Sequence, residues 1–347
     1  MAKLRYLKRI GVLGSIFLLL ALVPLTGVPS YQFYILERGI QNALVVLSLV
    51  ILLGYTGQLS LGQAGLVAVG AYTYGVLGVN YGVSPWIALL VAPVVTGLVG
   101  IVLGFPSFKL TGPFLVVNTL AFAEIVRILI LNAESLTGGP FGLNRIPTIA
   151  SGFSLYYIML VVGLLAAIGT LRLSRSHIGL ALKAIREDEV AAAAMGVNVR
   201  SYKLLAFVIS AVLAGLSGVF FANMAGYLNP DSFTLNESAT YLLMVVLGGM
   251  DNVTGSLLSS LAVTSLPEFL RFMVRSRMVV YSLILLLMLR YTKVLEIENL
   301  KHLLRRARPV PPSSVETAGT PTNVTSAFAG DPTARTAAAS GRDEVPK

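Results

Sequence analysis

Cysteine is absent from this chain of 347 residues, and histidine occurs only twice, as His177 and His302. Without cysteine the chain can form neither a disulfide nor a thiolate metal site, and two histidines alone do not make a typical zinc site. Charged residues are also scarce, at 12% of the sequence, where a soluble domain carries about a quarter. We therefore expect no metal ion, no cofactor bound by this chain, and no ordinary soluble fold.

Hydrophobic residues are abundant in place of the missing charge. They make up 55% of the chain, and the mean hydropathy is +0.80. Apolar stretches of nearly membrane-spanning length recur from Leu13 to Leu289, and one helical span needs about 20 such residues. The strands of a membrane barrel would alternate polar and apolar residues instead. The pattern predicts an all-α, polytopic membrane protein surrounded by lipid.

We expect about ten transmembrane helices, within a range of eight to ten. The candidate spans are 10–28, 36–53, 58–79, 85–104, 112–132, 153–171, 204–222, 238–250, 254–271 and 277–292. Two of them, 58–79 and 238–250, are weak enough to be broken or re-entrant helices. The basic start of the chain, followed directly by apolar residues, could also be a signal peptide, but its apolar run is about as long as a span and favours an uncleaved first helix.

The formal net charge of +10 indicates topology rather than binding of nucleic acid. Lysine and arginine gather near both ends and in the loop 172–203, and basic loops stay in the cytoplasm. The N-terminus, the C-terminus and this loop are therefore predicted to be cytoplasmic, which requires an even number of crossings. The same count places Arg271, Arg275 and Arg277 outside, against the rule.

The chain divides by composition into two parts. Residues 1–308 form the predicted transmembrane domain. Residues 309–347 are rich in Pro, Ser, Thr, Ala and Gly, and they have no apolar period that could build a core. We expect a disordered cytoplasmic tail.

The loop 172–203 has the spacing of one amphipathic helix at the membrane surface. Ser174 or Ser176 could cap its start, and Gly196 could end it in a left-handed conformation. A dense charge cluster, Arg186, Glu187, Asp188 and Glu189, lies beside an alanine run. Such a helix suits a groove on a partner protein, and an ordinary surface helix with a solvated charged face remains the alternative.

Polar side chains within the expected spans suggest a translocation path. Gln58, Ser60 and Gln63 interrupt a glycine-rich stretch and are poorly placed for lipid, so they should face the bundle interior or water. Close helix packing through the glycines alone is the alternative. Asn118, Thr119 and Glu124 in the span 112–132 are the further candidates.

Three local patterns have narrower readings. Glu124 and Arg127 are three residues apart on one helix face and are predicted to pair. The loop 134–147 contains glycine and proline turns that could dock a solute-carrying protein or simply join two helices. The small-residue spacings Gly100–Gly104 and Ala211–Gly215 predict close helix packing.

Five segments in one collinear order resemble the LivM-type permeases of branched-chain amino acid ABC importers, and more widely the family that includes urea and sugar permeases. They are GYTGQLSLGQAG at 54–65, SLTGGPFGL at 135–143, IGLALKAIREDEVAAAAMGVNV at 178–199, KLLAFVISAVLAGLSGVFFA at 203–222 and VVLGGM at 245–250. The chain departs from that family at Gln63, where a histidine is usual, and at Asp251, where a glycine is usual.

The resemblance implies a permease subunit in a bacterial or archaeal inner or plasma membrane. It also implies three kinds of protein partner: a second, LivH-like permease, two ATP-binding subunits and an extracytoplasmic solute-binding protein. Membrane lipid is the remaining partner, and no nucleic acid is expected. The segment 178–195 would be the coupling helix that docks the ATPases, with Glu189, Ala193 and Gly196 matching a short EAA-like motif.

The expected function is transport of leucine, isoleucine and valine without catalysis by this chain. The sequence has no G-x-x-x-x-G-K-[ST] phosphate-binding loop, so ATP would be hydrolysed by the partner subunits. A permease for urea or short amides is the first alternative. An ion-coupled secondary transporter is the second, and the scarcity of intramembrane acids argues against it.

Overall fold

The computed structural model describes residues 2–26, 30–107, 110, 112–150, 152–269 and the single positions 282 and 286. These residues belong to one compact unit, Met1–Met288. The predicted span 277–292, the arginines at 271, 275 and 277, the basic segment 301–308 and the tail 309–347 lie outside the described residues, apart from those two positions. The predictions made for them stay predictions.

The described chain is almost entirely helical. Its α-helices are α1 (Ala2–Leu22), α2 (Ser30–Leu49), α3 (Gln63–Val79), α4 (Pro85–Ser107), α5 (Pro113–Asn132), α6 (Glu134–Thr137), α7 (Phe153–Leu173), α8 (His177–Glu187), α9 (Glu189–Ala194), α10 (Val199–Ala225), α11 (Leu235–Gly248) and α12 (Val253–Phe269). Short elements connect them: η1 (Val23–Thr26), the π-helix η2 (Val50–Tyr55), η3 (Gly139–Phe141), β1 (Leu143–Asn144), β2 (Tyr227–Leu228) and η4 (Pro230–Ser232).

Five helical segments among the described residues are long and apolar enough to cross a membrane. They are Tyr31–Tyr55, Pro85–Ser107, Pro113–Asn132, Phe153–Leu173 and Val199–Ala225, and the shorter apolar helices are Leu13–Leu22, Gln63–Val79 and Val253–Pro267. The all-α membrane fold is thus present. Ten crossings and cytoplasmic termini remain expectations.

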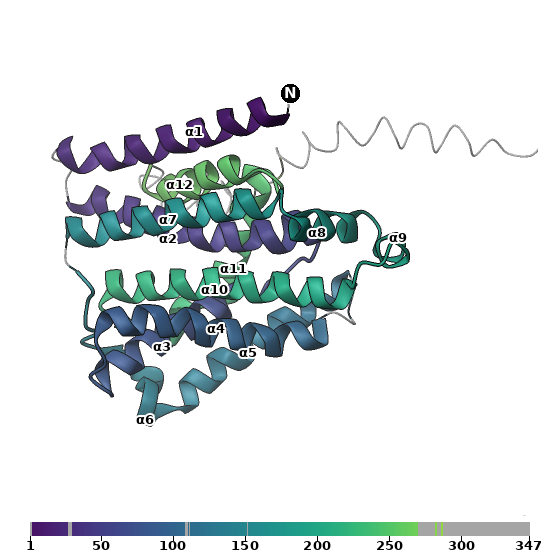
Figure 1. The fold of residues 1–347 in the computed structure, drawn as a ribbon. Coiled ribbons are helices and arrows are strands. Elements are labelled where there is room, and N and C mark those ends of the chain that lie inside the picture. Colours follow the sequence, from purple (N-terminus) through teal and green to yellow (C-terminus); the bar gives the residue numbers. More distant parts are fainter. Residues whose placement is uncertain are drawn as a thin grey trace, which may run out of the picture. The chain divides into compact units, whose positions relative to one another are not determined.

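The helix α10 is the centre of the packing, since it lies against α4, α3 and α2 (Figure 1). Small residues let these helices approach closely. A Cβ on Gly100 would meet the Cβ of Ala211, and a Cβ on Gly215 would meet the side chain of Thr96. The predicted packing role of the spacings Gly100–Gly104 and Ala211–Gly215 is confirmed.

The helix α2 ends in the π-helix η2, and residues 57–62 are then non-helical before α3 begins at Gln63. All six residues of η2 are buried. A Cβ on Gly54 would overlap the carbonyl of Met250, so the α11–α12 turn can approach only glycine here. Gly57 follows with φ of 70°, a conformation that favours glycine. The weak span 58–79 is therefore broken at its start.

At the opposite end of the bundle, β1 pairs antiparallel with β2, with Leu143 opposite Leu228. The turns that precede β1 depend on positive φ at Gly138, Gly139 and Gly142. This fits the tight turns predicted for the loop 134–147, and it joins that loop to the end of α10.

The loop 172–203 holds two helices, so the prediction of one continuous amphipathic helix is wrong. Asp188 has an extended backbone, and its carboxylate accepts hydrogen bonds from Val190 N at 2.8 Å and Ala191 N at 3.0 Å. An aspartate in this role starts a new helix rather than continuing the old one. Ser176 caps the start of α8, and Gly196 has a left-handed φ of 86°. Both features were predicted.

Candidate functional site

The helix pair α8–α9 projects at one end of the bundle, beside the end of α2 (Figure 1). The α8 helix is strongly amphipathic, with Leu182 and Ile185 buried against the protein. Gly179 fits directly onto the carbonyl of Leu173, where a Cβ would overlap. These contacts fix one face of α8, so its charged face is left outward.

Charged side chains of α8 attach this pair to η2 and to the α11–α12 turn. Arg186 donates from Nη1 to the carbonyl oxygen of Gly54 in η2. Lys183 Nζ lies 3.6 Å from Asp251 Oδ1 in the α11–α12 turn, and 5.2 Å from the ring centroid of Tyr55. A force on α8 would therefore reach η2 and the α11–α12 turn directly.

A further ion pair attaches α9 to α10. The Nζ of Lys203 contacts Glu189 Oε1, and only 3% of the lysine side chain is exposed. A buried cation without its partner is costly. The pair therefore holds α9 against the first turns of α10.

The predicted docking residues fall into two groups. Arg186, Glu187, Asp188, Ala193 and Gly196 are exposed, whereas Glu189 is half-buried beside Lys203. The sequence prediction missed Val190 and Met195, which are 80% and 85% exposed. Single exposed apolar side chains are common on protein surfaces, and the sequence signal for these two was a valine and a methionine flanking an alanine run.

The start of α3 is surrounded by hydroxyl groups from three segments. Leu61 N donates to Thr119 Oγ1 at 3.0 Å, Gly62 N to Ser60 Oγ at 3.2 Å, and Ala64 N to Ser238 Oγ at 3.0 Å. The first amides of a helix have no partner within the helix. Ser238 Oγ on α11 satisfies Ala64 N here, and hydroxyls from α5 and from the loop itself accept from the two amides that precede the helix.

Gln63 sits at the centre of the buried polar interior. Its Nε2 donates to Ser210 Oγ at 3.1 Å, and its Oε1 accepts from Ser48 Oγ at 3.2 Å. One amide thus joins α3 to both α10 and α2. All three side chains are fully buried.

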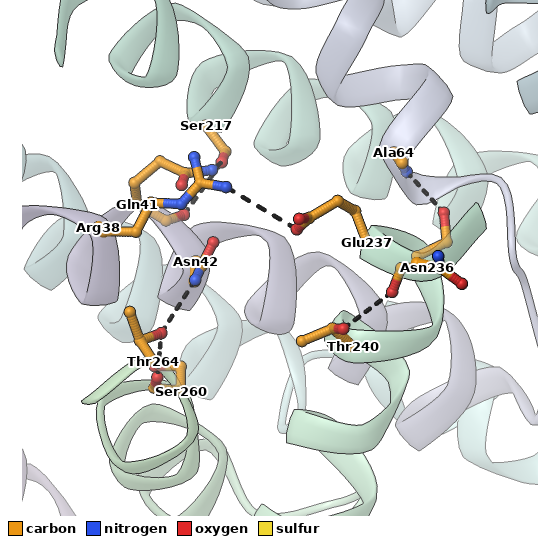
Figure 2. Close-up of polar contacts among 11 residues, drawn as sticks. Arg38, Gln41, Asn42, Ala64, Ser217, Asn236, Glu237, Thr240, Ser260 and Thr264 are labelled. Carbon is orange, nitrogen blue, oxygen red and sulfur yellow. Dashed lines mark hydrogen bonds and ion pairs between the residues drawn. The ribbon is translucent and has the colours of Figure 1, made fainter. Parts of the chain in front are cut away.

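A second polar group lies among α2, α10, α11 and α12 (Figure 2). Gln41 Nε2 donates to Ser217 Oγ at 2.6 Å, and Asn42 Nδ2 donates to Thr264 Oγ1 at 2.9 Å. Figure 2 shows the guanidinium of Arg38 directed toward Glu237, and their closest N–O distance is 3.8 Å. Sequence reasoning missed this ion pair, although Arg38 already lay within the predicted span 36–53.

The predicted path residues do not form one cluster. Ser60, Gln63 and Thr119 meet around the start of α3, as described above. Asn118 donates from Nδ2 to Ser107 Oγ at 3.2 Å on α4, and Gln58 Oε1 accepts from Thr56 Oγ1 at 3.2 Å. Asn118 and Gln58 therefore make contacts separate from the group around the start of α3.

Glu124 lies on the exposed side of α5. Arg127 Nη2 is 3.0 Å from Glu124 Oε1, so the predicted pair is confirmed. The same guanidinium reaches Asp231 Oδ1 in η4 at 3.2 Å. Within the described part of the chain, no group of three or more His, Asp and Glu side chains could hold a metal ion.

The fold and these contacts define a class of protein. Long apolar helices enclose hydroxyls, amides and a broken helix, and a charged helix pair projects from one end, which is the arrangement of a polytopic membrane transport protein. Residues 31–289 match the family described as the permease component of branched-chain amino acid transport systems. The chain belongs to this family.

Individual relatives of the chain are also named as permease proteins. The chain is 38% identical over 255 residues to the high-affinity branched-chain amino acid transport system permease protein LivM of Escherichia coli, an alignment covering 65% of this chain and 60% of the relative. It is 26% identical over 189 residues to the guanosine ABC transporter permease protein NupQ of Bacillus subtilis, covering 48% and 59%.

A probable branched-chain amino acid transport permease protein LivH of Methanocaldococcus jannaschii is 27% identical over 243 residues, covering 65% of this chain and 76% of the relative. The chain spans about 60% of the length of the LivM relative from Escherichia coli. No solved structure matches the chain.

Proposed function

We propose that this chain is the permease subunit of an ATP-driven importer of leucine, isoleucine and valine in the cell membrane. The observation that carries the proposal is the family match over residues 31–289. That range includes the broken helix, the buried amides and the α8–α9 pair. The chain itself performs no bond chemistry in this proposal.

Relatives guide the choice of substrate. The relative at 38% identity is named for branched-chain amino acids, and the one at 26% is named for guanosine. Identity is higher to the former, and more residues align with it. Branched-chain amino acids are therefore the proposed solutes.

The proposed complex contains a second, LivH-like permease, two ATP-binding subunits and an extracytoplasmic solute-binding protein. The bundle crosses the membrane ten times, with both termini in the cytoplasm, and the ATPases dock on α8–α9. Closure of the ATPases moves this pair, and the contacts of Arg186 and Lys183 carry the movement to η2 and to the α11–α12 turn. The two openings of the path then alternate.

Uptake by the reconstituted complex tests the proposal. Proteoliposomes that hold the complete complex should accumulate labelled leucine, isoleucine and valine only with ATP and the solute-binding protein. Unlabelled valine should compete with leucine, and guanosine and urea should not. Uptake that needs an ion gradient and no ATPase would overturn the proposal in favour of a secondary transporter.

A further inference from the structure

Two opposite charges face each other between α2 and α11. Arg38 is eight residues after the start of α2, which corresponds to about 12 Å of helix. Its guanidinium is directed toward Glu237 (Figure 2), the closest nitrogen and oxygen are 3.8 Å apart, and the two side chains are 21% and 37% accessible. The gap is longer than a hydrogen bond. Charges at this depth do not suit lipid tails, so the open side of the pair faces water or a polar solute.

An unpaired carbonyl oxygen lies beside this ion pair. Asn42 is 5% exposed and is one helical turn after Arg38, on the same face of α2. Its Nδ2 donates to Thr264 Oγ1 at 2.9 Å, and Thr264 Oγ1 donates to the carbonyl oxygen of Ser260 at 2.6 Å. The hydroxyl has a single hydrogen, so it can only accept from Asn42. The Oδ1 of Asn42 has no hydrogen-bond partner among the residues that the structure describes, and Figure 2 shows it directed away from Thr264.

Aromatic rings adjoin the guanidinium on its other side. The guanidinium carbon of Arg38 is 4.7 Å from the ring centroid of Phe221 on α10, which is the distance of a cation–π contact. Phe221 meets Phe233 edge to face at 5.2 Å, and Phe233 meets Tyr72 of α3 at 6.1 Å. All three rings are buried. An apolar surface therefore lies next to the two charges.

This arrangement matches the chemistry of an amino acid with an apolar side chain. Such a solute carries a carboxylate, which a guanidinium can bind through two parallel hydrogen bonds. It also carries an ammonium with three donors, which needs several acceptors. The carboxylate of Glu237 and Oδ1 of Asn42 are acceptors of the required kind. A charge or donor left unpaired away from water is costly, so one site that serves both groups of the solute lowers that cost.

We propose that Arg38, Asn42, Glu237 and Phe221 form a binding site for the zwitterionic solute on the translocation path. The proposal rests on the proposed function and specifies which residues recognise the amino acid. Arg38 binds the α-carboxylate, Glu237 and Asn42 Oδ1 bind the α-ammonium, and the branched side chain lies against Phe221. In the described state Arg38 and Glu237 pair with each other, and the solute takes the place of each partner.

The helix α11 links this site to α8. Glu237 lies in the first turn of α11, and the helix ends at Gly248, three residues before Asp251 in the α11–α12 turn. Lys183 of α8 is 3.6 Å from Asp251 at that end. A movement of α8 would therefore move α11 and change the distance between Glu237 and Arg38.

The double variant Arg38→Met, Glu237→Gln tests the site without leaving a charge unpaired. Removing one member of a buried pair is strongly destabilising, whereas neutral replacement of both is often tolerated, so the complex should assemble and unfold near the temperature of the parent. Uptake into proteoliposomes would be measured with ATP and a saturating amount of solute-binding protein. We expect the maximal rate of leucine uptake to fall at least tenfold.

Asp231→Asn is the matched control. It removes a carboxylate from another ion pair, in which Asp231 Oδ1 is 3.2 Å from Arg127 Nη1, and that pair is outside the proposed site. The maximal rate of leucine uptake should stay within twofold of the parent.

Phe221→Trp supplies a readout that a purely structural role would not change. The indole keeps a ring beneath the guanidinium and leaves less room for the side chain of the solute. Leucine has one more methylene than valine, so the ratio of the maximal uptake rates of valine and leucine should rise at least threefold. A loss of stability lowers both rates and leaves their ratio unchanged. The ratio therefore tests the site even where the double variant does not assemble.

The outcomes separate this inference from the proposed function. Leucine uptake at the parental rate by an assembled double variant, an equal loss in Asp231→Asn, or an unchanged ratio in Phe221→Trp would overturn the site and leave the proposed function standing. A parent complex that takes up none of the three amino acids would overturn the proposed function, and the site with it.

Discussion

Single glycines set how closely the central helices of this protein approach. Gly70 on α3 lies against the backbone of Gly215 on α10, and an added Cβ would overlap it. Gly169 on α7 is also helical, but a Cβ there would meet no atom within 4 Å. The two positions share a residue type and a helical backbone and differ in what surrounds them.

We expect Gly70→Ala to lower the free energy of unfolding by about 1–3 kcal/mol, since overpacking moves backbone that cannot yield cheaply. Gly169→Ala should raise it by up to about 1 kcal/mol, because alanine is the better helix former. Unfolding of the purified protein in detergent, followed by circular dichroism, measures both. A Gly70→Ala protein as stable as the parent would show that α3 and α10 are not in the described contact.

For buried amides and hydroxyls, the sequence predicts burial and does not predict the hydrogen-bond partner. The sequence placed Gln63 away from lipid, and the structure confirms that it is buried. Its partners Ser48 and Ser210 are 15 and 147 residues away. Nothing local in the sequence could pair them.

At the scale of elements, the α8–α9 pair is held in place by a side chain that the sequence analysis assigned to ATPase docking. Arg186 was predicted to dock the ATPases, and its guanidinium is bonded to the Gly54 carbonyl of η2. The residue is exposed as a whole. It can therefore serve both as a surface charge and as a tie to the membrane helices.

We expect Arg186→Met to reduce the leucine transported per ATP hydrolysed severalfold. A hydrogen bond from a charged donor contributes about 1.5–3 kcal/mol, and its loss would let α8 move without moving η2. ATPase activity and uptake would be measured on the same proteoliposomes. Arg172→Met, at the exposed end of α7, is the control and should leave the ratio near that of the parent.

Arg186→Met could instead lower uptake and ATPase activity together and leave the leucine transported per ATP unchanged. That result would contradict a coupling role for the hydrogen bond from Arg186 to Gly54. Such a result would indicate that Arg186 acts at the docking surface, as the sequence pattern first suggested. Crosslinking of the ATPases to α9 would then be weakened by the same substitution.

At the scale of the whole molecule, the end of the bundle that bears α8–α9 should face the cytoplasm. The turn between α3 and α4 contains Tyr81 and should lie on the other side of the membrane, because α4, α5 and α7 separate it from α8. Tyr81 is 66% exposed and Met195 is 85% exposed. Each can therefore report its side as a single cysteine.

A membrane-impermeant maleimide added to intact cells, or to spheroplasts where an outer membrane intervenes, should label Tyr81→Cys and should leave Met195→Cys unlabelled. Permeabilised membranes that lack the ATPase subunits should allow both reactions. Labelling of Met195→Cys in intact spheroplasts would show that α8–α9 lies outside the cytoplasm. The proposed docking of ATPases on α8–α9 would then be wrong.

Much of this protein follows from its sequence alone. Apolar segments of spanning length must be helical, because lipid offers their backbone no other hydrogen-bond partner. The spacing of Glu124 and Arg127 predicted their ion pair, and the glycine and proline turns of the loop 134–147 predicted its shape. These features are local, so neighbouring residues determine them.

Tertiary structure decided the rest. The hydrogen bond from Arg186 to Gly54, the Arg38–Glu237 pair and the reach of Arg127 to Asp231 all depend on which helices lie side by side. Such contacts join residues up to 199 positions apart, as 237 − 38 shows, and apolar spans pack with one another through small residues that many pairings could share. A local pattern therefore predicts which segments are helices, and only their packing determines which polar groups meet.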